Sequence, residues 1–233
     1  MYLILFDIDG TLVLSGRAGV RAMNRACHDI VRGDALTGMA FAGRTDWSIL
    51  DEIARRSGRT LDRPLLDELR QRYVRHLVEE IELPGEGVKA VMPGVRELLA
   101  ALERRDDAAV ALLTGNFVEG AQIKLEHFDL WRYFPCGAFG GDAASRNDLV
   151  PIAIERARAC GLADVTPADV LVVGDTPSDV ECALVAGATP VAVATGGFSV
   201  EDLRQSGAQI VFEDLADTGA FLKLLDAKLV DNR

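Results

Sequence analysis

Residues 3–12 read Leu-Ile-Leu-Phe-Asp-Ile-Asp-Gly-Thr-Leu, so an unbroken apolar run ends in two aspartates, a glycine and a threonine. The run at residues 3–6 has no polar position, which is typical of a short central strand covered on both faces by helices. Asp7 and Asp9 follow at the carboxyl end of this strand, two residues apart, so their side chains point to the same side. Gly10 permits a tight turn directly after them.

The position of these two aspartates favours a chemical role. In open α/β sheets the carboxyl ends of the strands face the ligand crevice, so side chains that follow a strand are placed for chemistry rather than for packing. The alternative is an ordinary turn after a strand, because Asp-Gly is common turn chemistry. Two carboxylates this close repel each other unless a cation or a shared proton lies between them.

The composition limits the class of protein. The chain has 233 residues, which is enough for one good-sized domain or a domain with a smaller insert. The net charge of −11 disfavours a nucleic-acid backbone or an anionic membrane as partner. No apolar run approaches the length of a membrane span, and the few residues before Asp7 are too short for a secretory signal. We therefore expect a cytoplasmic protein with four reduced cysteines: Cys27, Cys136, Cys160 and Cys182.

Two kinds of periodicity divide the chain. Residues 15–87 show only helical spacing, and we predict no strand between residues 15 and 85. Residues 83–87, Leu-Pro-Gly-Glu-Gly, are the clearest linker. We expect three helices here. The first begins at Ser15-Gly16 and includes Ile30 and Val31, and the second runs from about Thr45 to Gly58. The third starts near Asp62-Arg63-Pro64 and includes Ile81.

From residue 88 onward, predicted strands alternate with predicted helices. This alternation implies an α/β fold with a Rossmann-like, mostly parallel sheet covered by helices on both faces. The all-helical segment is then an insert. The apolar runs that predict strands are residues 109–113, 170–173, 191–193 and 210–211, with a weaker one at 136–139.

The sequence Asp7-Ile8-Asp9-Gly10-Thr11-Leu12 resembles the first motif of the haloacid dehalogenase superfamily, most of whose members are magnesium-dependent phosphohydrolases. The helical segment resembles the superfamily's C1-type cap, which is inserted directly after that motif. The resemblance implies a catalytic core formed by residues 1–14 and 88–233 and a helical cap domain formed by residues 15–87. Within the superfamily the chain resembles phosphoglycolate phosphatases and their unassigned relatives.

Two further strand ends resemble superfamily motifs. Residues 112–116, Leu-Leu-Thr-Gly-Asn, resemble the second motif, which implies that the Thr114 hydroxyl donates to the phosphoryl group and that Gly115 and Asn116 bind substrate. The alternative for Thr114 is a cap on the next helix. Residues 172–179, Val-Val-Gly-Asp-Thr-Pro-Ser-Asp, resemble the fourth motif.

The fourth motif implies that Asp175 is a metal ligand and that Asp179 belongs to the ligand shell. A capping box of Ser178 and Glu181 is the alternative account of Asp179, since an aspartate also favours a helix N-terminus. That account leaves Asp175 unexplained, because it stands directly behind an apolar strand.

A cation is needed if these aspartates converge. Asp7, Asp9, Asp175 and Asp179 would place up to four negative charges in one crevice. Oxygen ligands without a nearby histidine or cysteine select a hard ion, and Mg²⁺ is the natural choice. We expect these four residues to hold Mg²⁺.

The third motif is where the sequence departs from the common superfamily pattern, which places a lysine before the helix that follows the third strand. No lysine lies between Lys124 and Lys223, and Arg146 is the candidate replacement, as in some phosphatase branches. Arginine stays protonated and can bridge phosphate and carboxylate oxygens. The alternative is a surface arginine at a helix start, where the helix dipole slightly disfavours a cation.

The resemblance implies a Mg²⁺-dependent phosphatase that hydrolyses a small phosphomonoester through an aspartyl-phosphate. Asp7 would attack phosphorus, and Asp9 would protonate the leaving alkoxide and then activate water. Thr114 and Arg146 would neutralise charge on the phosphoryl oxygens. The alternatives are a phosphomutase of the same fold, similar to β-phosphoglucomutase, and a non-catalytic phosphate-binding protein. Thr11 slightly favours the phosphatase over the mutase, because the mutase branch more often has valine at this position.

Within the helical segment, Gly43-Arg44-Thr45-Asp46 is the most marked polar stretch, and Arg17 lies close to the hinge. If the segment closes over the site, Arg44 is a candidate for substrate binding. The alternative is that Thr45 or Asp46 caps a helix and both arginines are solvated. We expect a small phosphorylated metabolite as partner, no nucleic acid or membrane, and a monomer or homodimer.

Overall fold

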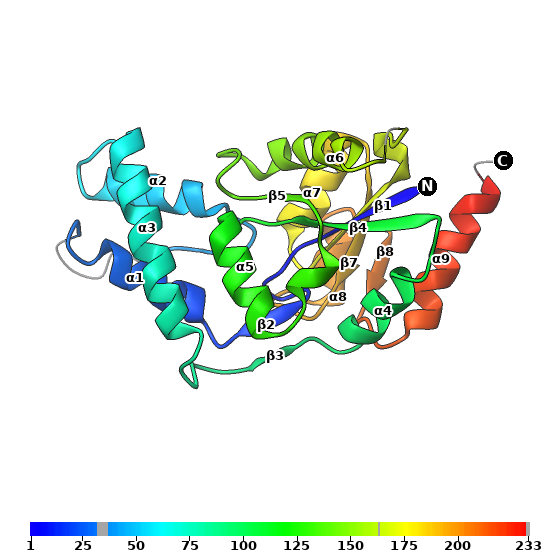
Figure 1. Cartoon of the computed structure of the whole chain (residues 1–233), viewed down its shortest axis with the longest axis horizontal. Helices are drawn as coiled ribbons and strands as arrows, with labels where there is room; N and C mark the ends of the chain where they lie inside the picture. Colours follow the sequence, from blue (N-terminus) through cyan, green and yellow to red (C-terminus); the bar gives the residue numbers. More distant parts are fainter. Residues whose placement is uncertain (32–36, 163, 232–233) are drawn as a thin grey trace.

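A six-stranded parallel sheet forms the centre of the computed structural model, which describes residues 1–31, 37–162 and 164–231 (Figure 1). The strand order is β5-β4-β1-β6-β7-β8, and every neighbouring pair is parallel. The N-terminal strand therefore lies inside the sheet, between β4 and β6, as its continuous apolar run predicts. The strands are β1 (Tyr2–Phe6), β4 (Ala108–Leu113), β5 (Gly137–Ala138), β6 (Val170–Gly174), β7 (Thr189–Val193) and β8 (Ile210–Phe212).

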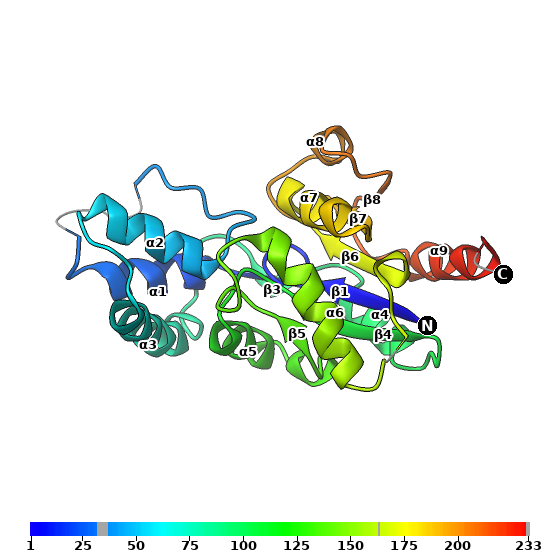
Figure 2. The ribbon, with the colours of Figure 1, turned by 90° about the horizontal axis from the view of Figure 1, so that it is seen from above.

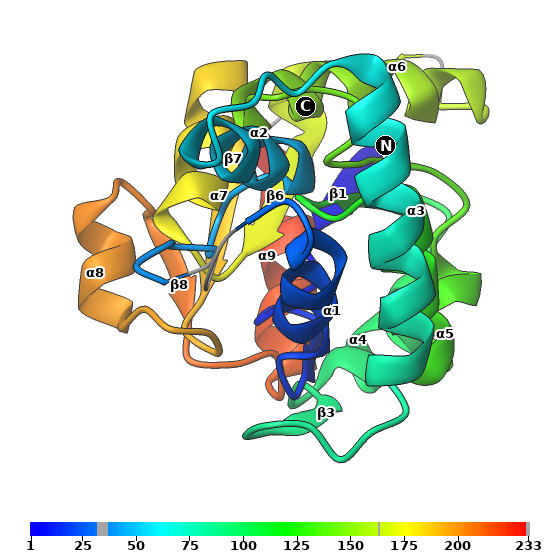
Figure 3. The ribbon, with the colours of Figure 1, turned by 90° about the vertical axis from the view of Figure 1, so that its left-hand side faces the viewer.

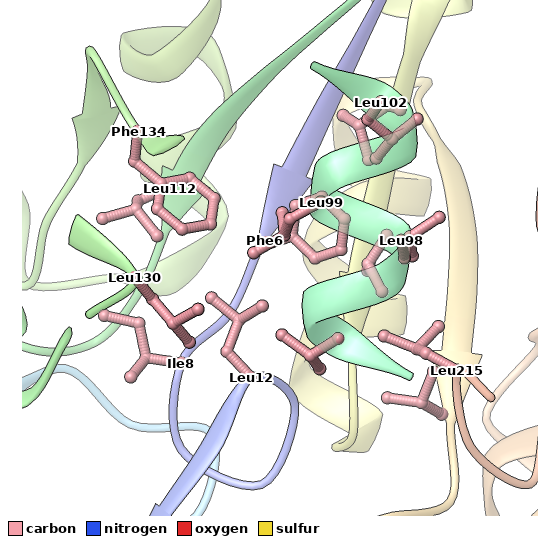
Figure 4. Close-up of a cluster of buried hydrophobic side chains, with 14 of the residues drawn as sticks. Phe6, Ile8, Leu12, Leu98, Leu99, Leu102, Leu112, Leu130, Phe134 and Leu215 are labelled. Carbon is pink, nitrogen blue, oxygen red and sulfur yellow. The ribbon is translucent and has the colours of Figure 1, made fainter. Parts of the chain in front are cut away.

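Helices cover both faces of this sheet. Along β1 the side chains alternate, so that Ile4 and Phe6 are buried on one face while Leu3 and Leu5 are buried on the other. Figure 4 shows Phe6 among the leucines of α4 on the first of these faces. The first face is covered by α4 (Val95–Leu102), α5 (Val118–His127) and α9 (Thr218–Asp231), and the second by α6 (Leu149–Ala159) and α7 (Pro177–Ala186).

The remaining elements of the core are short. Helix α8 (Val200–Gln205) packs against α7 and β8 and lies at the upper edge of the molecule in the view from above (Figure 2). Single 3₁₀ turns form at Trp131–Tyr133, Arg146–Asp148 and Pro167–Asp169.

Three helices pack on one another beyond the end of the sheet rather than on its faces (Figures 1 and 3). We call residues 15–87, which contain them, the helical insert. Their apolar sides form a separate buried cluster that includes Leu50, Leu69 and Tyr73, and one core side chain, Phe117, enters it. The helices are α1 (Ala18–Cys27), α2 (Asp46–Arg56) and α3 (Arg63–Glu80).

Two short antiparallel strands, β2 (Val13–Ser15) and β3 (Lys89–Val91), join the insert to the core. The prediction that Ser15-Gly16 opens the first helix is therefore wrong. Ser15 ends β2, and the helix begins only after Gly16 and Arg17, both of which have positive φ (57° and 62°) and turn the chain out of the strand. The helix is also shorter than predicted, because α1 ends at Cys27 and does not include Ile30 and Val31.

The other fold predictions agree with the structure. Apart from Ser15, the described residues between 15 and 85 form no strand, and α3 begins at Arg63 with Asp62 as its N-cap. The strand predicted weakly at residues 136–139 is only two residues long. Within the described residues, no helix has the combined length and apolarity needed to cross a membrane.

Candidate active site

The carboxyl ends of β1, β4 and β6 meet at one edge of the sheet, where Asp7, Thr114 and Asp175 directly follow the strands. A cavity of about 430 Å³ lies at this edge and is lined by side chains of both the core and the helical insert. Thr114 and Asp179 are not among the residues that line it. The predicted site residues that do line it are Asp7, Asp9, Arg44, Gly115, Asn116, Arg146 and Asp175.

Asp7, Asp175 and Asp179 form a buried acidic cluster, in which one carboxylate oxygen of each lies within 4.8 Å of the others. The Thr11 hydroxyl donates a hydrogen bond of 3.1 Å to Asp175 Oδ1. Gly10 has φ +89° and passes so near this carboxylate that a Cβ on it would collide with Asp175. The turn after β1 therefore supports the ligand that follows β6, although the two lie far apart in the sequence.

Burial dominates the electrostatics of this cluster. Desolvation raises the pKa of Asp7 to about 6, with Arg146 opposing the shift and Asp179 adding to it. Desolvation, followed by the charges of Asp179 and Asp7, raises the pKa of Asp175 well above its ordinary value. Asp7 and Asp175 therefore retain protons to unusually high pH unless a cation neutralises them.

Arg146 lies buried beside two members of the cluster. Its Nη2 is 3.2 Å from Asp7 Oδ1 and also donates to Asp179 Oδ1. Burial lowers the pKa of Arg146, but the charges of Asp179 and Asp7 outweigh burial and raise it above its ordinary value. Its Nε is buried and has no hydrogen-bond partner among the described residues. The alternative of a surface arginine is therefore wrong, and one donor is available for a further acceptor.

The donor set of the acidic cluster fits a hard divalent cation such as Mg²⁺. When all three carboxylates are ionised, the single positive charge of Arg146, which pairs with Asp7 and Asp179, leaves two uncompensated negative charges. All candidate ligand atoms are oxygens. The carboxylate of Asp9, which we also expected in the ligand set, is not part of this cluster within the described residues.

Asp9 is instead held by the side chains of Asn116 and Lys124. Its Oδ2 accepts hydrogen bonds from Asn116 Nδ2 at 2.8 Å and from Lys124 Nζ at 2.6 Å. Lys124 Nζ also donates to Asn116 Oδ1 at 2.7 Å, so the three groups form a closed network. The Asp9 side chain is 42% exposed, whereas that of Lys124 is 5% exposed. Asp9 therefore presents a fixed but accessible carboxylate.

Lys124 is a site residue that the sequence analysis missed. It lies in α5, on the same buried side as Ala121, which is three residues before it, and Leu125, which directly follows it. A lysine within an apolar helical stripe is the signal that could have identified it, because lysine is rarely buried without a partner.

Thr114 is fully buried and stands behind Asn116, whose Nδ2 donates to its hydroxyl at 2.8 Å. The structure thus brings Thr114 to the network around Asp9, but does not place its hydroxyl on the cavity wall. Gly115 accepts a backbone hydrogen bond from Asp46 of the insert at 2.6 Å. A Cβ on Gly115 would collide with the backbone of Arg44, so glycine is needed for this close approach.

Asp179 is held by a capping box, but not by the predicted one. Helix α7 has Thr176 as its N-cap and Pro177 as its first residue, so Asp179 rather than Glu181 occupies the third position. Asp179 Oδ2 accepts from the Thr176 backbone N at 3.0 Å and from its hydroxyl at 2.7 Å. The other oxygen pairs with Arg146, so capping and the cluster use different atoms of one carboxylate.

The polar stretch of the insert reaches the core through Thr45 and Asp46. Thr45 caps α2 and also donates to the backbone O of Ala144 at 2.9 Å. Asp46 is buried and accepts from Phe117 N at 2.8 Å. Desolvation raises the pKa of Asp46 to about 6, with Lys124 opposing the shift. The predicted N-cap at Thr45 is confirmed.

The two arginines of the insert differ. Arg44 lines the cavity, but its guanidinium is paired with Glu52 and donates to the backbone O of Ser48 at 2.7 Å. Arg17 has a side chain that is 63% exposed and lies 3.6 Å from the equally exposed carboxylate of Glu86. Arg44 is therefore partly buried and paired rather than solvated.

Known proteins resemble this chain over nearly its full length. It is 30% identical over 222 residues to the phosphoglycolate phosphatase of Rhodospirillum rubrum, covering 94% of this chain and 90% of that protein. It is 27% identical over 244 residues to the phosphoglycolate phosphatase of Pseudomonas putida, covering 99% and 86%. A solved structure of a hydrolase from Pseudomonas syringae aligns with a TM-score of 0.68 at 21% identity, covering 96% of this chain and 98% of that one.

The decisive comparison is with the family model described as haloacid dehalogenase-like hydrolase, which matches residues 1–187. This range includes the turn after β1, the end of β4 and the whole acidic cluster. The chain therefore belongs to the haloacid dehalogenase-like hydrolase family, as its first motif predicts.

Proposed function

We propose that this hydrolase is a Mg²⁺-dependent phosphatase that hydrolyses a small phosphorylated metabolite in the cytoplasm through an aspartyl-phosphate on Asp7. The observation that carries the proposal is that one cavity is lined by two different carboxylates. That of Asp7 is buried beside Arg146, and that of Asp9 is accessible. The phosphoglycolate phosphatase names of its relatives support the reaction class.

In the first half-reaction the Asp7 carboxylate attacks phosphorus, and the bond between phosphorus and the ester oxygen breaks. The protonated form of Asp9 gives its proton to that oxygen, so the alcohol leaves neutral. Lys124 and Asn116 both bind Oδ2 of Asp9. Among the described contacts Oδ1 is therefore the oxygen that can exchange a proton.

In the second half-reaction Asp9 acts as a base. It takes a proton from the water that attacks phosphorus, and the bond between phosphorus and the Asp7 carboxylate oxygen breaks. This step releases inorganic phosphate and regenerates the free Asp7 carboxylate. One residue thus serves as acid and then as base, because the two half-reactions are the reverse of each other in proton flow.

Charge on the phosphoryl oxygens is neutralised by groups fixed before the substrate arrives. The Arg146 guanidinium lies beside Asp7 and has an Nε without a partner among the described residues. Bound Mg²⁺ would be held by Asp7, Asp175 and Asp179 and would supply a further positive charge. Thr114 and Gly115 act indirectly, because Thr114 supports Asn116 and Gly115 binds the insert.

We further propose that the helical insert is a separate cap domain that closes over the site. Contacts made by Thr45 and Asp46 with the core, and the entry of Phe117 into the insert cluster, support a closed arrangement. Closure would exclude bulk water from the phosphoryl group.

The test is phosphate release from a panel of small phosphomonoesters, with and without Mg²⁺, beside an Asp7→Asn control. We expect metal-dependent release that falls by roughly 10⁴-fold or more in the variant, because the nucleophile is lost. Mass spectrometry of the quenched wild-type reaction should find phosphate on Asp7. Undiminished release by Asp7→Asn would refute the mechanism, and an isomeric ester without free phosphate would indicate a mutase.

A further inference from the structure

The cavity has two chemically different ends. Its floor is formed by the charged network of the core, whereas the insert supplies mostly apolar side chains beside the charged Arg17, Arg44 and Asp46. These side chains come from β2, all three helices of the insert and the loop before α2. The apolar wall consists of Leu14, Val20, Met23, Phe41, Ile49 and Tyr73.

The size of the cavity exceeds what a two-carbon leaving group needs. Its volume of about 430 Å³ falls within the range of roughly 300 to 1,000 Å³ that is typical of sites for drug-sized ligands. Phosphoglycolate, the compound named in the relatives, carries only two carbons beyond its phosphoryl group. A larger leaving group would fill the space that faces the apolar wall.

The cations around the cavity are already paired. Arg146 is held by the acidic cluster, Lys124 by Asp9, and Arg44 by Glu52. Arg17 is mostly exposed to solvent. Among the described lining residues, every buried cation therefore has a carboxylate partner, and the one unpartnered donor, Arg146 Nε, is assigned to the phosphoryl group. A carboxylate on the leaving group would be buried without a cation of its own, which is costly.

We propose that the leaving group is an uncharged, largely apolar alcohol of more than two carbons, seated on the wall formed by the insert. The inference rests on the proposed function and names its substrate class. The products are the free alcohol and inorganic phosphate. Phosphoglycolate is then a poor substrate despite the names of the relatives.

The experiment compares isobutyl phosphate with phosphoglycolate. Both esters branch at the second carbon of the leaving group, but isobutyl phosphate carries two methyl groups there, whereas phosphoglycolate carries the two carboxylate oxygens. We expect the holoenzyme to show a kcat/KM at least roughly tenfold higher for isobutyl phosphate, since a methylene-sized apolar contact is worth that much in a hydrophobic site. Across ethyl, butyl and hexyl phosphate, kcat/KM should rise while the chemistry of the leaving alcohol stays nearly constant.

A substitution in the wall provides an independent check. Val20→Lys places a cation beside the leaving group, and we expect it to shift the preference towards phosphoglycolate. The matched control is Val78→Lys, since Val78 is 53% exposed on α3 and does not line the cavity. This control should keep the wild-type preference.

The outcomes separate the inference from the proposed function. A wild-type preference for phosphoglycolate, especially one that Arg17→Gln removes, would overturn the substrate class while leaving the phosphatase intact. If no ester releases phosphate, the proposed function fails, and calorimetric titration of the Mg²⁺-loaded wild-type protein with each ester still tests the inference. Tighter binding of isobutyl phosphate in that titration supports the apolar wall, and tighter binding of phosphoglycolate overturns it.

Discussion

The core and the helical insert contribute to the same cavity in different ways. In the core, Asp7 and Asp175 each follow a strand, and the parallel sheet brings them to one edge. In the insert, lining residues such as Met23, Ile49 and Tyr73 come from three helices and also belong to its own hydrophobic cluster. The core residues are fixed by topology, whereas the insert residues are fixed by helix packing.

This difference separates the reaction from its specificity. In the proposed mechanism, the charges that act on a phosphoryl group lie in the core, at positions that the sheet dictates. The surface proposed to contact the leaving group belongs mostly to the insert, where residues can change without disturbing strand ends. We therefore expect core substitutions to reduce activity towards every substrate, and insert substitutions to change the relative activity towards different substrates.

Substitution of Asp9 should produce the largest effect after that of Asp7. We expect Asp9→Asn to reduce kcat by roughly 10² to 10⁴, because the variant can neither protonate the leaving alkoxide nor activate water. The fold should be retained, since the Asp9 side chain is 42% exposed. Phosphate release and circular dichroism measure the two quantities. Wild-type turnover in a folded variant would exclude Asp9 as acid and base.

Substitution of Lys124 tests whether fixing Asp9 matters for catalysis. We expect Lys124→Met to reduce kcat by about 10- to 100-fold with little change in KM, because a misdirected carboxylate lowers the rate of proton transfer. Lys124→Arg should recover part of the loss. The control is Lys223→Met, at an exposed position of α9. A rise in KM without a fall in kcat would show instead that Lys124 binds substrate.

The strand-end residues could be predicted because their signal is local. An apolar run followed by aspartate identifies both a strand and its end, and parallel topology then brings Asp7 and Asp175 together. Arg146 was predicted in another way, from the resemblance to the third superfamily motif and the lack of a lysine between Lys124 and Lys223. None of these inferences needed the detailed packing of the elements.

Contacts across the fold could not be predicted in the same way. Lys124 is 115 residues from its partner Asp9, and helical periodicity alone does not say which charge a buried lysine meets. The capping box of α7 starts two residues earlier than predicted, because Pro177 favours the first helical position and so makes Thr176 the N-cap. The burial of Thr114 behind Asn116 depends on side-chain packing that no strand pattern encodes.

The contact between core and insert gives a pH-dependent prediction. Burial raises the pKa of Asp46 from 3.8 to about 6, so the folded protein retains this proton to a higher pH than the unfolded chain. The contribution of Asp46 to stability therefore falls as pH rises from about 4 to 6, by at most about 3 kcal/mol. In EDTA, Asp46→Asn should become more stable relative to wild type across this range.

Urea denaturation at several pH values measures that difference. Asp202→Asn is the control, because hydrogen bonds from Ser199 lower the pKa of this exposed carboxylate, and its variant should show no such rise. A difference between Asp46→Asn and wild type that does not change with pH would show that Asp46 is not desolvated in solution.

The smallest expected effect concerns the relative stability of the two regions. Cys27 lies in the insert cluster and Cys182 in the core cluster, and burial raises the pKa of each thiol to about 12. Both react with a thiol reagent only after local opening. In a protein that carries serine at the half-buried Cys136 and the exposed Cys160, we expect Cys27 to be labelled about tenfold faster in mild denaturant. The insert has its own, smaller hydrophobic cluster and is connected along the chain through β2 and β3, so we expect it to open first. Equal labelling rates would mean that both regions unfold as one unit.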